Sequence, residues 1–163
     1  MNTDPAMSDI FPLIAALSGP TVQGRVAAAA ALGRSGNSSA ILPLTKSLSD
    51  PHSKVRMESA QALGRLSDTE AVPALIDALS DTEPSVRAAV IAAIGRIRDR
   101  QAAEALICCL RDNDSMVRIA SAVVLGKLGD HRAIKPLKAL GMDRFEDVRD
   151  AAADALRRIR KLS

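Results

Sequence analysis

The amino-acid sequence predicts an all-α fold, namely a right-handed α–α superhelix, or solenoid, of five 31-residue helix pairs. Three observations support this prediction: a repeat period that stays constant along the chain, apolar residues at helical spacing inside each period, and polar turn residues between the helices. One helix pair cannot bury its apolar face alone, so successive pairs must stack and share a hydrophobic core.

The period appears in several columns of residues at once. One column holds Gly33, Gly64, Gly95 and Gly126, followed by Arg157 in the last unit. Eight residues before these positions stand Arg25, Arg56, Arg87, Arg118 and Arg149. Six residues before the arginines stand Gly19 and then Asp50, Asp81, Asp112 and Asp143. The columns give a single domain over 10–163 with units of about 10–40, 41–71, 72–102, 103–133 and 134–163, preceded by a flexible N-terminus over 1–9.

Each unit contains two helices joined by a short turn. The first helix of the second unit places Ile41, Leu44 and Leu48 on one face, at spacings of three and four residues. A turn rich in Asp, Pro and Ser follows at 49–54 and favours a chain reversal. The second helix is amphipathic in the same way, and an aspartate such as Asp68 in the connection after it can cap the next helix.

The composition restricts the core and the partners. Hydrophobic residues make up 47% of the chain, but it has no Trp, no Tyr and only two Phe, so small aliphatic side chains must pack the helices closely. The net charge of +3 is too small by itself to indicate a nucleic-acid or membrane protein. Charge is uneven, since residues 1–81 hold 6 basic and 8 acidic side chains and residues 82–163 hold 16 and 11.

Cysteine usage and hydropathy favour a cytoplasmic protein without a membrane partner. Cys108 and Cys109 are adjacent, so they cannot form a long-range disulfide or a four-ligand zinc site. The first nine residues lack the basic residues of a signal peptide, and no apolar run approaches the roughly 20 residues of a membrane span.

The pattern DPxxxVRxxAAxALGxLGD is almost complete at 50–68 and at 112–130. With this motif the chain resembles, over residues 10–163, the HEAT-like repeat family associated with phycocyanobilin lyases. The resemblance implies the solenoid fold. It leaves the function open, because similar repeats serve lyase subunits, metal hydroxylases, DNA glycosylases and adaptors.

The resemblance also implies a structural ladder in which the aspartate and arginine of one unit bond to each other and to the turn backbone. The implied pairs are Asp50 with Arg56, Asp81 with Arg87, Asp112 with Arg118, and Asp143 with Arg149. An alternative is that the arginines remain open to an anionic ligand. Gly19 in the first unit and Arg157 in the last depart from the pattern, and Arg157 indicates a polar end cap.

In solenoids that this chain resembles, the second helices form the concave wall, so their exposed positions are candidate partner-binding residues. These candidates are Glu58, Gln61, Arg65, Ala89, Ala92, Arg96, Ala120, Val123 and Lys127. The cations continue a row that also includes Arg34 and Arg158. This row either binds an anionic partner or only complements the helix dipoles.

Catalytic and metal-ligand patterns are not found in the sequence. His52 and His131 lack the adjacent Glu of the HEAT-repeat iron hydroxylases, and neither cysteine has a histidine in register to act as a base. We therefore expect no catalytic residue, no metal and no cofactor.

The sequence thus predicts a non-enzymatic adaptor or scaffold that binds a protein partner with acidic and apolar or aromatic features on its concave face. A lyase-like subunit, whose arginine row holds the propionates of a bilin, is the alternative. Non-specific nucleic-acid contact through the basic C-terminal half is a lesser alternative. The absence of Trp and Tyr argues against a glycosylase-like DNA site.

Overall fold

The computed structural model describes residues 10–162, and the predicted flexible segment 1–9 lies outside the described residues. Over residues 10–162 the secondary structure is entirely helical. The short helices are α2 (Ile10–Ala16), α4 (Ile41–Ser47), α6 (Val72–Ala78), α8 (Ala103–Cys109) and α10 (Ile134–Leu140). The long helices are α3 (Val22–Ser35), α5 (Ser53–Leu66), α7 (Pro84–Ile97), α9 (Ser115–Leu128) and α11 (Glu146–Lys161). The predicted all-α solenoid of helix pairs is confirmed.

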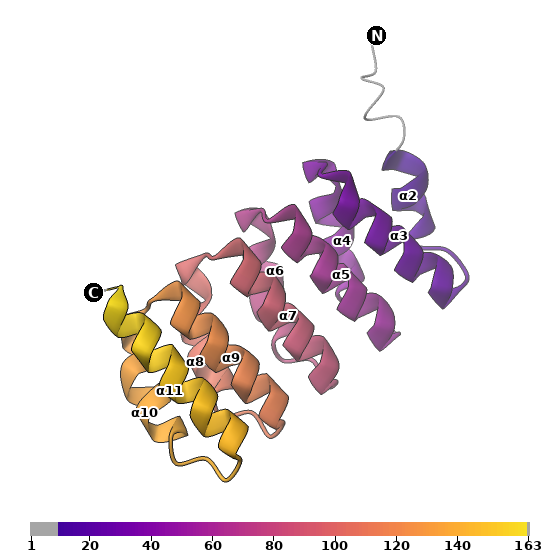
Figure 1. The fold of residues 1–163 in the computed structure, drawn as a ribbon. Coiled ribbons are helices and arrows are strands. Elements are labelled where there is room, and N and C mark those ends of the chain that lie inside the picture. The colour runs from indigo at the N-terminus through magenta and orange to yellow at the C-terminus, as the bar shows by residue number, and fades with distance from the viewer. Residues whose placement is uncertain (1–9, 163) are drawn as a thin grey trace.

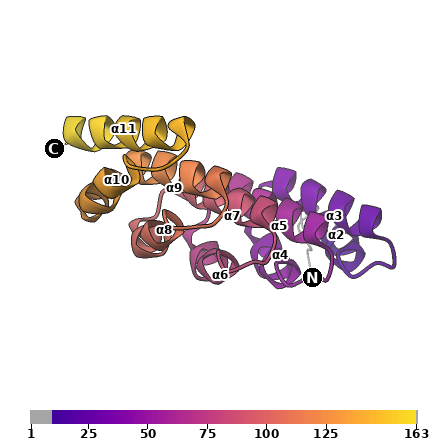
Figure 2. The same cartoon turned by 90° about the horizontal axis from the view of Figure 1, so that it is seen from below.

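The helices form two layers. Figure 1 shows the long helices side by side in chain order, with the short helices behind them. Figure 2 shows the same stack from below, with the long helices on the inner side of a shallow arc and the short helices on its outer side. The long helices therefore form the inner wall that the resemblance implied.

A 3₁₀ turn, which the sequence pattern did not predict, links each unit to the next. The turns are η1 (Ser38–Ala40), η2 (Thr69–Ala71), η3 (Arg100–Ala102) and η4 (His131–Ala133). An Asn or Asp before each turn accepts the backbone N–H two residues on, as Asp68 does from Glu70 and Asp130 from Arg132. The predicted aspartate caps are therefore present, and they start a 3₁₀ turn that runs directly into the next short helix.

The long helices touch through the glycine column. A Cβ atom on Gly64 would lie 2.8 Å from the Cα of Ala93, and one on Gly33 would lie 2.6 Å from the Cα of Ala62. Only glycine permits this separation, because a real Cβ atom does not approach a backbone atom so closely. Fully buried leucines, among them Leu44 and Leu75, fill the space between the two layers. Small residues therefore set the helix spacing, as the composition predicted.

The arginine and aspartate columns form a ladder, but its pairing differs from the prediction. Arg56 donates from Nε to Oδ2 of Asp81 at 2.6 Å and from Nη2 to Oδ1 at 2.8 Å. The same bidentate contact joins Arg25 to Asp50, Arg87 to Asp112, and Arg118 to Asp143. Each carboxylate thus binds the arginine of the preceding unit.

The predicted side-chain pairs within a unit, Asp50 with Arg56, Asp81 with Arg87, Asp112 with Arg118 and Asp143 with Arg149, are therefore wrong. Within a unit the arginine reaches the backbone instead, since Arg56 Nη1 donates to the carbonyl of Asp50 at 2.9 Å. The Asp50 carboxylate turns away to Arg25 and also accepts the N–H of His52. One arginine thus fixes the turn of its own unit and ties that unit to the next.

The two terminal units depart from the ladder in ways that fit this pairing. Arg25 Nη1 donates to the carbonyl of Gly19 at 3.1 Å, a contact that needs no side chain. Arg149 makes hydrogen bonds within the described residues only to the carbonyls of Asp143 and Arg144. Arg157 is exposed in the glycine column, where its side chain prevents the close approach that Gly126 permits.

Candidate partner-binding wall

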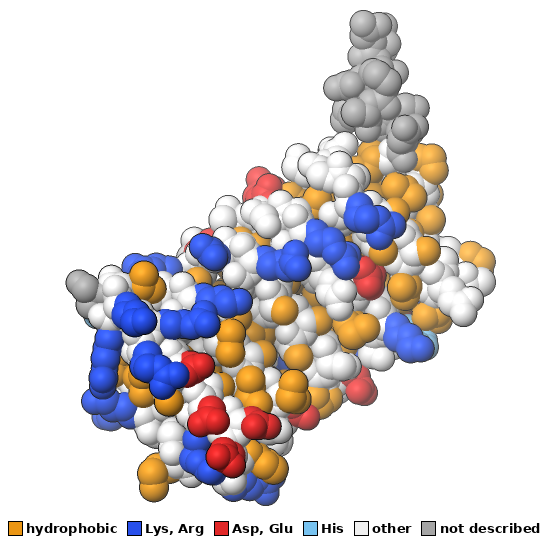
Figure 3. All heavy atoms as spheres, in the orientation of Figure 1, with side chains coloured by type: hydrophobic (Ala, Val, Ile, Leu, Met, Phe, Trp, Pro, Cys, Tyr) orange, Lys and Arg blue, Asp and Glu red, His pale blue; other side chains and the backbone are white. Residues whose placement is uncertain are grey.

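The exposed surface of the long helices is the inner wall of the solenoid. A row of cations lies in the last turn of each long helix: Arg34, Arg65, Arg96, Lys127 and Arg158. All five are exposed. Figure 3 shows blue side chains running across the wall near the C-terminal ends of these helices. At this position each positive charge also stabilises the dipole of its own helix.

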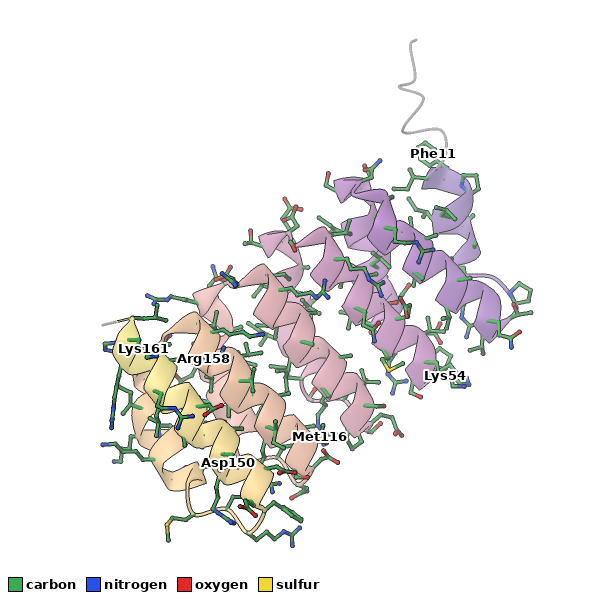
Figure 4. The ribbon with its side chains drawn as sticks, in the orientation of Figure 1. Phe11, Lys54, Met116, Asp150, Arg158 and Lys161 are labelled. Carbon is green, nitrogen blue, oxygen red and sulfur yellow. The ribbon has the colours of Figure 1, made fainter. Side chains whose placement is uncertain are left out.

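A shallow apolar strip lies beside the cations in the middle units. Ala92 is exposed, and Ala120 and Val123 are half-buried. Ala89 is only 9% exposed and offers little surface to a partner. Met116, which the repeat pattern did not indicate as a wall residue, is 64% exposed on α9 and lies on the same side in Figure 4. The strip is thus built from small side chains with one flexible apolar residue near its edge.

The second unit differs from the others because its polar residues engage its own cation. Arg65 Nη1 donates to Glu58 Oε1 at 2.8 Å, and Arg65 Nη2 donates to Gln61 Oε1 at 3.4 Å. Glu58 and Gln61 occupy the positions that hold Ala89 and Ala92 in the next unit. The sequence could have indicated this contact, because residues seven apart lie on one helical face two turns from each other.

The other cations of the row have no hydrogen bond or ion pair with a side chain of residues 10–162. These are Arg34, Arg96, Lys127 and Arg158. In α11 the nearby carboxylate of Asp154 pairs with Arg157 and leaves Arg158 unengaged. Arg96, Lys127 and Arg158 therefore form a run of three unpaired cations in consecutive units.

The last helix separates charge along its length. Glu146 and Asp147 stand in the first turn of α11, whereas Arg158, Arg160 and Lys161 stand in its last turn. Figure 3 shows acidic side chains near the start of this helix, and Figure 4 places Asp150 well away from Arg158 and Lys161 along it. An anionic ligand would therefore be attracted to the edge of the wall at the helix C-termini.

The outer layer carries grooves between successive short helices. A groove of about 590 Å³ between α8 and α10 is lined by residues that include Ile107, Cys108 and Met142. A similar groove of about 580 Å³ lies between α2 and α4. Because these grooves recur with the repeat, they follow from the stacking and do not by themselves indicate a ligand site.

The two cysteines lie in different environments on α8. Cys108 is exposed, whereas Cys109 is buried, as expected for a packing residue. Burial raises the pKa of the Cys109 thiol to about 11, with a smaller contribution from the Asp112 carboxylate. His52 and His131 lie in connections, before α5 and in η4. Among residues 10–162, no three His, Cys, Asp or Glu side chains are grouped closely enough to hold a metal ion, and no helix is long and apolar enough to cross a membrane.

Solved structures include several with this architecture. A chain of the CpcE–CpcF complex of phycocyanin lyase from Nostoc sp. PCC7120 is 26% identical, with a TM-score of 0.81 over 99% of this chain and 67% of that one. A designed armadillo repeat protein in complex with the peptide (KR)4 is 20% identical, with a TM-score of 0.69 over 93% and 82%. Human deoxyhypusine hydroxylase is 17% identical, with a TM-score of 0.56 over 96% and 97%. The last two show the fold alone.

Sequence comparison gives the family. No curated protein sequence matches the chain significantly. A family model of HEAT repeats matches residues 10–84 and 72–157, which together span nearly all the described residues. The repeat period and the paired helices agree with this match. The chain belongs to the HEAT-repeat family.

Proposed function

We propose that this chain is a non-enzymatic adaptor that binds a protein partner on its inner wall. The observation that supports this proposal is the run of unpaired cations Arg96, Lys127 and Arg158 beside exposed and half-buried small apolar side chains on one continuous surface. A wall of this kind offers charge at its edge and van der Waals contact along its centre. The partner is a protein segment with acidic and apolar or aromatic side chains.

The wall itself lacks the aromatic residues that dominate most binding hot spots, although arginine is another common one. The partner must therefore supply aromatic or large aliphatic side chains if the interface is tight. The small side chains at Ala92, Ala120 and Val123 leave space for such groups. The designed armadillo protein bound to (KR)4 has the same kind of fold and is described with a basic peptide. The row of cations here favours a peptide of the opposite charge.

Charge reversal on the wall tests the proposal. Arg96→Glu combined with Lys127→Glu should abolish capture of the partner from an extract of the source cells while circular dichroism shows unchanged helix content. The matched control is Lys46→Glu combined with Lys135→Glu, because both lysines are exposed on the short-helix layer and the net charge changes equally. The captured protein is identified by mass spectrometry and titrated against all three purified chains.

The partner should be retained by the parent chain and the control variant and lost from the wall variant. Equal capture by the wall variant would rule out this face. Equal loss from both variants would show that net charge, and not the wall, determines capture.

The similarity to a chain of the CpcE–CpcF complex of phycocyanin lyase supports a second candidate, a lyase-like subunit that binds a tetrapyrrole or a phycobiliprotein. In that role the arginine row would hold the propionate groups of a bilin. Mixing the purified chain with a bilin should then shift the visible absorbance of the bilin. The double variant Arg96→Glu with Lys127→Glu should not produce this shift. An unchanged spectrum with the bilin in excess would exclude this candidate.

A further inference from the structure

Within the proposed binding wall, the pairing of Glu58 with Arg65 divides the cation row into two parts. The Arg65 side chain is 34% exposed, and its guanidinium has an anionic partner in its own helix at 2.8 Å. In the third and fourth units, alanine or valine replaces Glu58 and Gln61, so Arg96 and Lys127 have no acceptor on their own helix face. The continuous run of unpaired cations therefore begins at Arg96 and continues to the C-terminal end, and Arg34 is separated from it by the paired Arg65.

The spacing of these charges favours one partner conformation. Packed helices lie about 8–10 Å apart, so cations at the same position in successive units are separated by about that distance. A polyproline II helix has three residues per turn and a rise of about 3.1 Å, which places every third side chain on one face at intervals of about 9.3 Å. In a β-strand, by contrast, residues three apart point to opposite faces.

We propose, as an extension of the proposed function, that the wall binds an extended acidic segment in polyproline II conformation with a carboxylate at every third residue. Three such carboxylates lie against Arg96, Lys127 and Arg158. Of the two residues between successive acids, one faces the strip formed by Ala92, Ala120 and Val123 and the other faces solvent, because the three side chains of a turn point to three faces. Glu58 closes the site at the second unit, because its carboxylate pairs with Arg65 and leaves no free cation there for a fourth acid.

A pair of labelled peptides tests the spacing. The first is an end-capped Glu-Pro-Ala-Glu-Pro-Ala-Glu, and the control is Glu-Glu-Glu-Pro-Ala-Pro-Ala with the same composition and charge. Fluorescence anisotropy at low salt should show at least threefold tighter binding of the spaced peptide to the full chain. Arg96→Gln combined with Lys127→Gln should weaken its binding about tenfold, since each exposed ion pair contributes about two- to fivefold. Equal affinity for the two peptides would overturn the proposal.

The role of Glu58 has a test of its own with an opposite sign. Glu58→Gln should free Arg65 and raise the affinity for a ten-residue peptide with a fourth glutamate in phase, by about two- to fivefold. The matched control is Glu104→Gln, which changes the net charge equally on the exposed side of α8. If both variants raise the affinity equally, or neither does, Glu58 does not close the site.

Two further results separate this inference from the proposed function. A labelled seven-nucleotide single strand that bound more tightly than the spaced peptide would overturn the assignment to an acidic protein segment. If the chain binds the two peptides equally while Arg96→Glu with Lys127→Glu still loses the natural partner, the proposed three-residue spacing of the acids is overturned and the proposed function stays intact.

Discussion

The pairing of the arginine ladder can be measured with two double-mutant cycles. The first cycle combines Arg56→Ala with Asp81→Ala, the residues whose side chains meet across the unit boundary at 2.6 and 2.8 Å. The second combines Arg56→Ala with Asp50→Ala, the pair within one unit. The measurement is urea unfolding followed by circular dichroism, because the chain has no Trp or Tyr to report by fluorescence.

The expected magnitudes follow from the geometry. Two charge-assisted hydrogen bonds join Arg56 to Asp81, and their side chains are only 14% and 7% exposed. Each single substitution should lower the free energy of unfolding by about 3 kcal/mol, because it leaves a half-buried charge without its partner. The coupling in the first cycle should be about 2 kcal/mol.

In the second cycle the coupling should stay below about 0.5 kcal/mol, because Arg56 contacts the backbone of Asp50 and that carbonyl survives the substitution. A coupling in the second cycle equal to or larger than that in the first would refute the ladder between units. Unchanged helix content in the single variants confirms that both cycles report on folded chains.

Three further predictions concern packing, pH and thiol reactivity. Gly64→Ala should lower the free energy of unfolding by about 2 kcal/mol or more, because the new Cβ would lie 2.8 Å from the Cα of Ala93. Gly36→Ala is the control: a Cβ there meets no atom within 4 Å, but φ is 66°, so the free energy of unfolding should fall by only about 1 kcal/mol. Equal losses in the two variants would contradict the close packing at Gly64. Hydrogen bonds from Arg118 hold the pKa of Asp143 below its usual 3.8, so the ionised carboxylate stabilises the fold above about pH 4 and this stabilisation is lost as the pH falls further. In Asp143→Asn the urea midpoint should therefore fall less between about pH 5 and pH 3 than it does in the parent chain. An equal fall in both chains would argue against the pairing. Iodoacetamide at pH 8 should label Cys108 and spare Cys109, because burial raises the pKa of the Cys109 thiol to about 11. Equal rates of labelling at both cysteines, measured by peptide mapping, would contradict the burial of Cys109.

The fold could be predicted because several columns of residues share one period, but the ladder pairing could not. Arg56, Arg87 and Arg118 each have one aspartate of the repeat before them in their own unit and another after them in the next. The pattern therefore cannot distinguish Asp50 from Asp81 as the partner of Arg56. The resemblance pointed to the pair within the unit. The structure chooses the other because the backbone carbonyl of Asp50 already occupies Nη1, which leaves Nε and Nη2 facing the next unit.

The backbone conformation at the ends of the long helices could not be predicted from the repeat pattern either. Gly36 and Gly129 end their helices with φ of 66°, as glycine readily does. Ser67 and Arg98 take the same left-handed conformation at equivalent positions, with φ of 54° and 61°. Tertiary stacking here overrides the residue preference, so the repeat keeps its geometry where the glycine is lost. On the wall, the pairing of Glu58 with Arg65 could have been predicted from their spacing alone.

The offset of the ladder has a consequence for how such a chain can change length. Each arginine of the ladder binds the aspartate of the following unit, and each glycine of the column meets an alanine or valine of the following long helix. Excising 72–102 would therefore bring Asp112 to the place of Asp81 beside Arg56, and Val124 to the place of Ala93 beside Gly64. Both contacts would be restored in kind. Duplication or deletion of a whole internal unit, such as 41–71 or 72–102, thus preserves the contacts at every boundary. A cut of any other length would break one. Shortening the chain in this way would also bring Arg65 next to Lys127. The length of the solenoid and the order of the cations along its wall would therefore change together, one unit at a time.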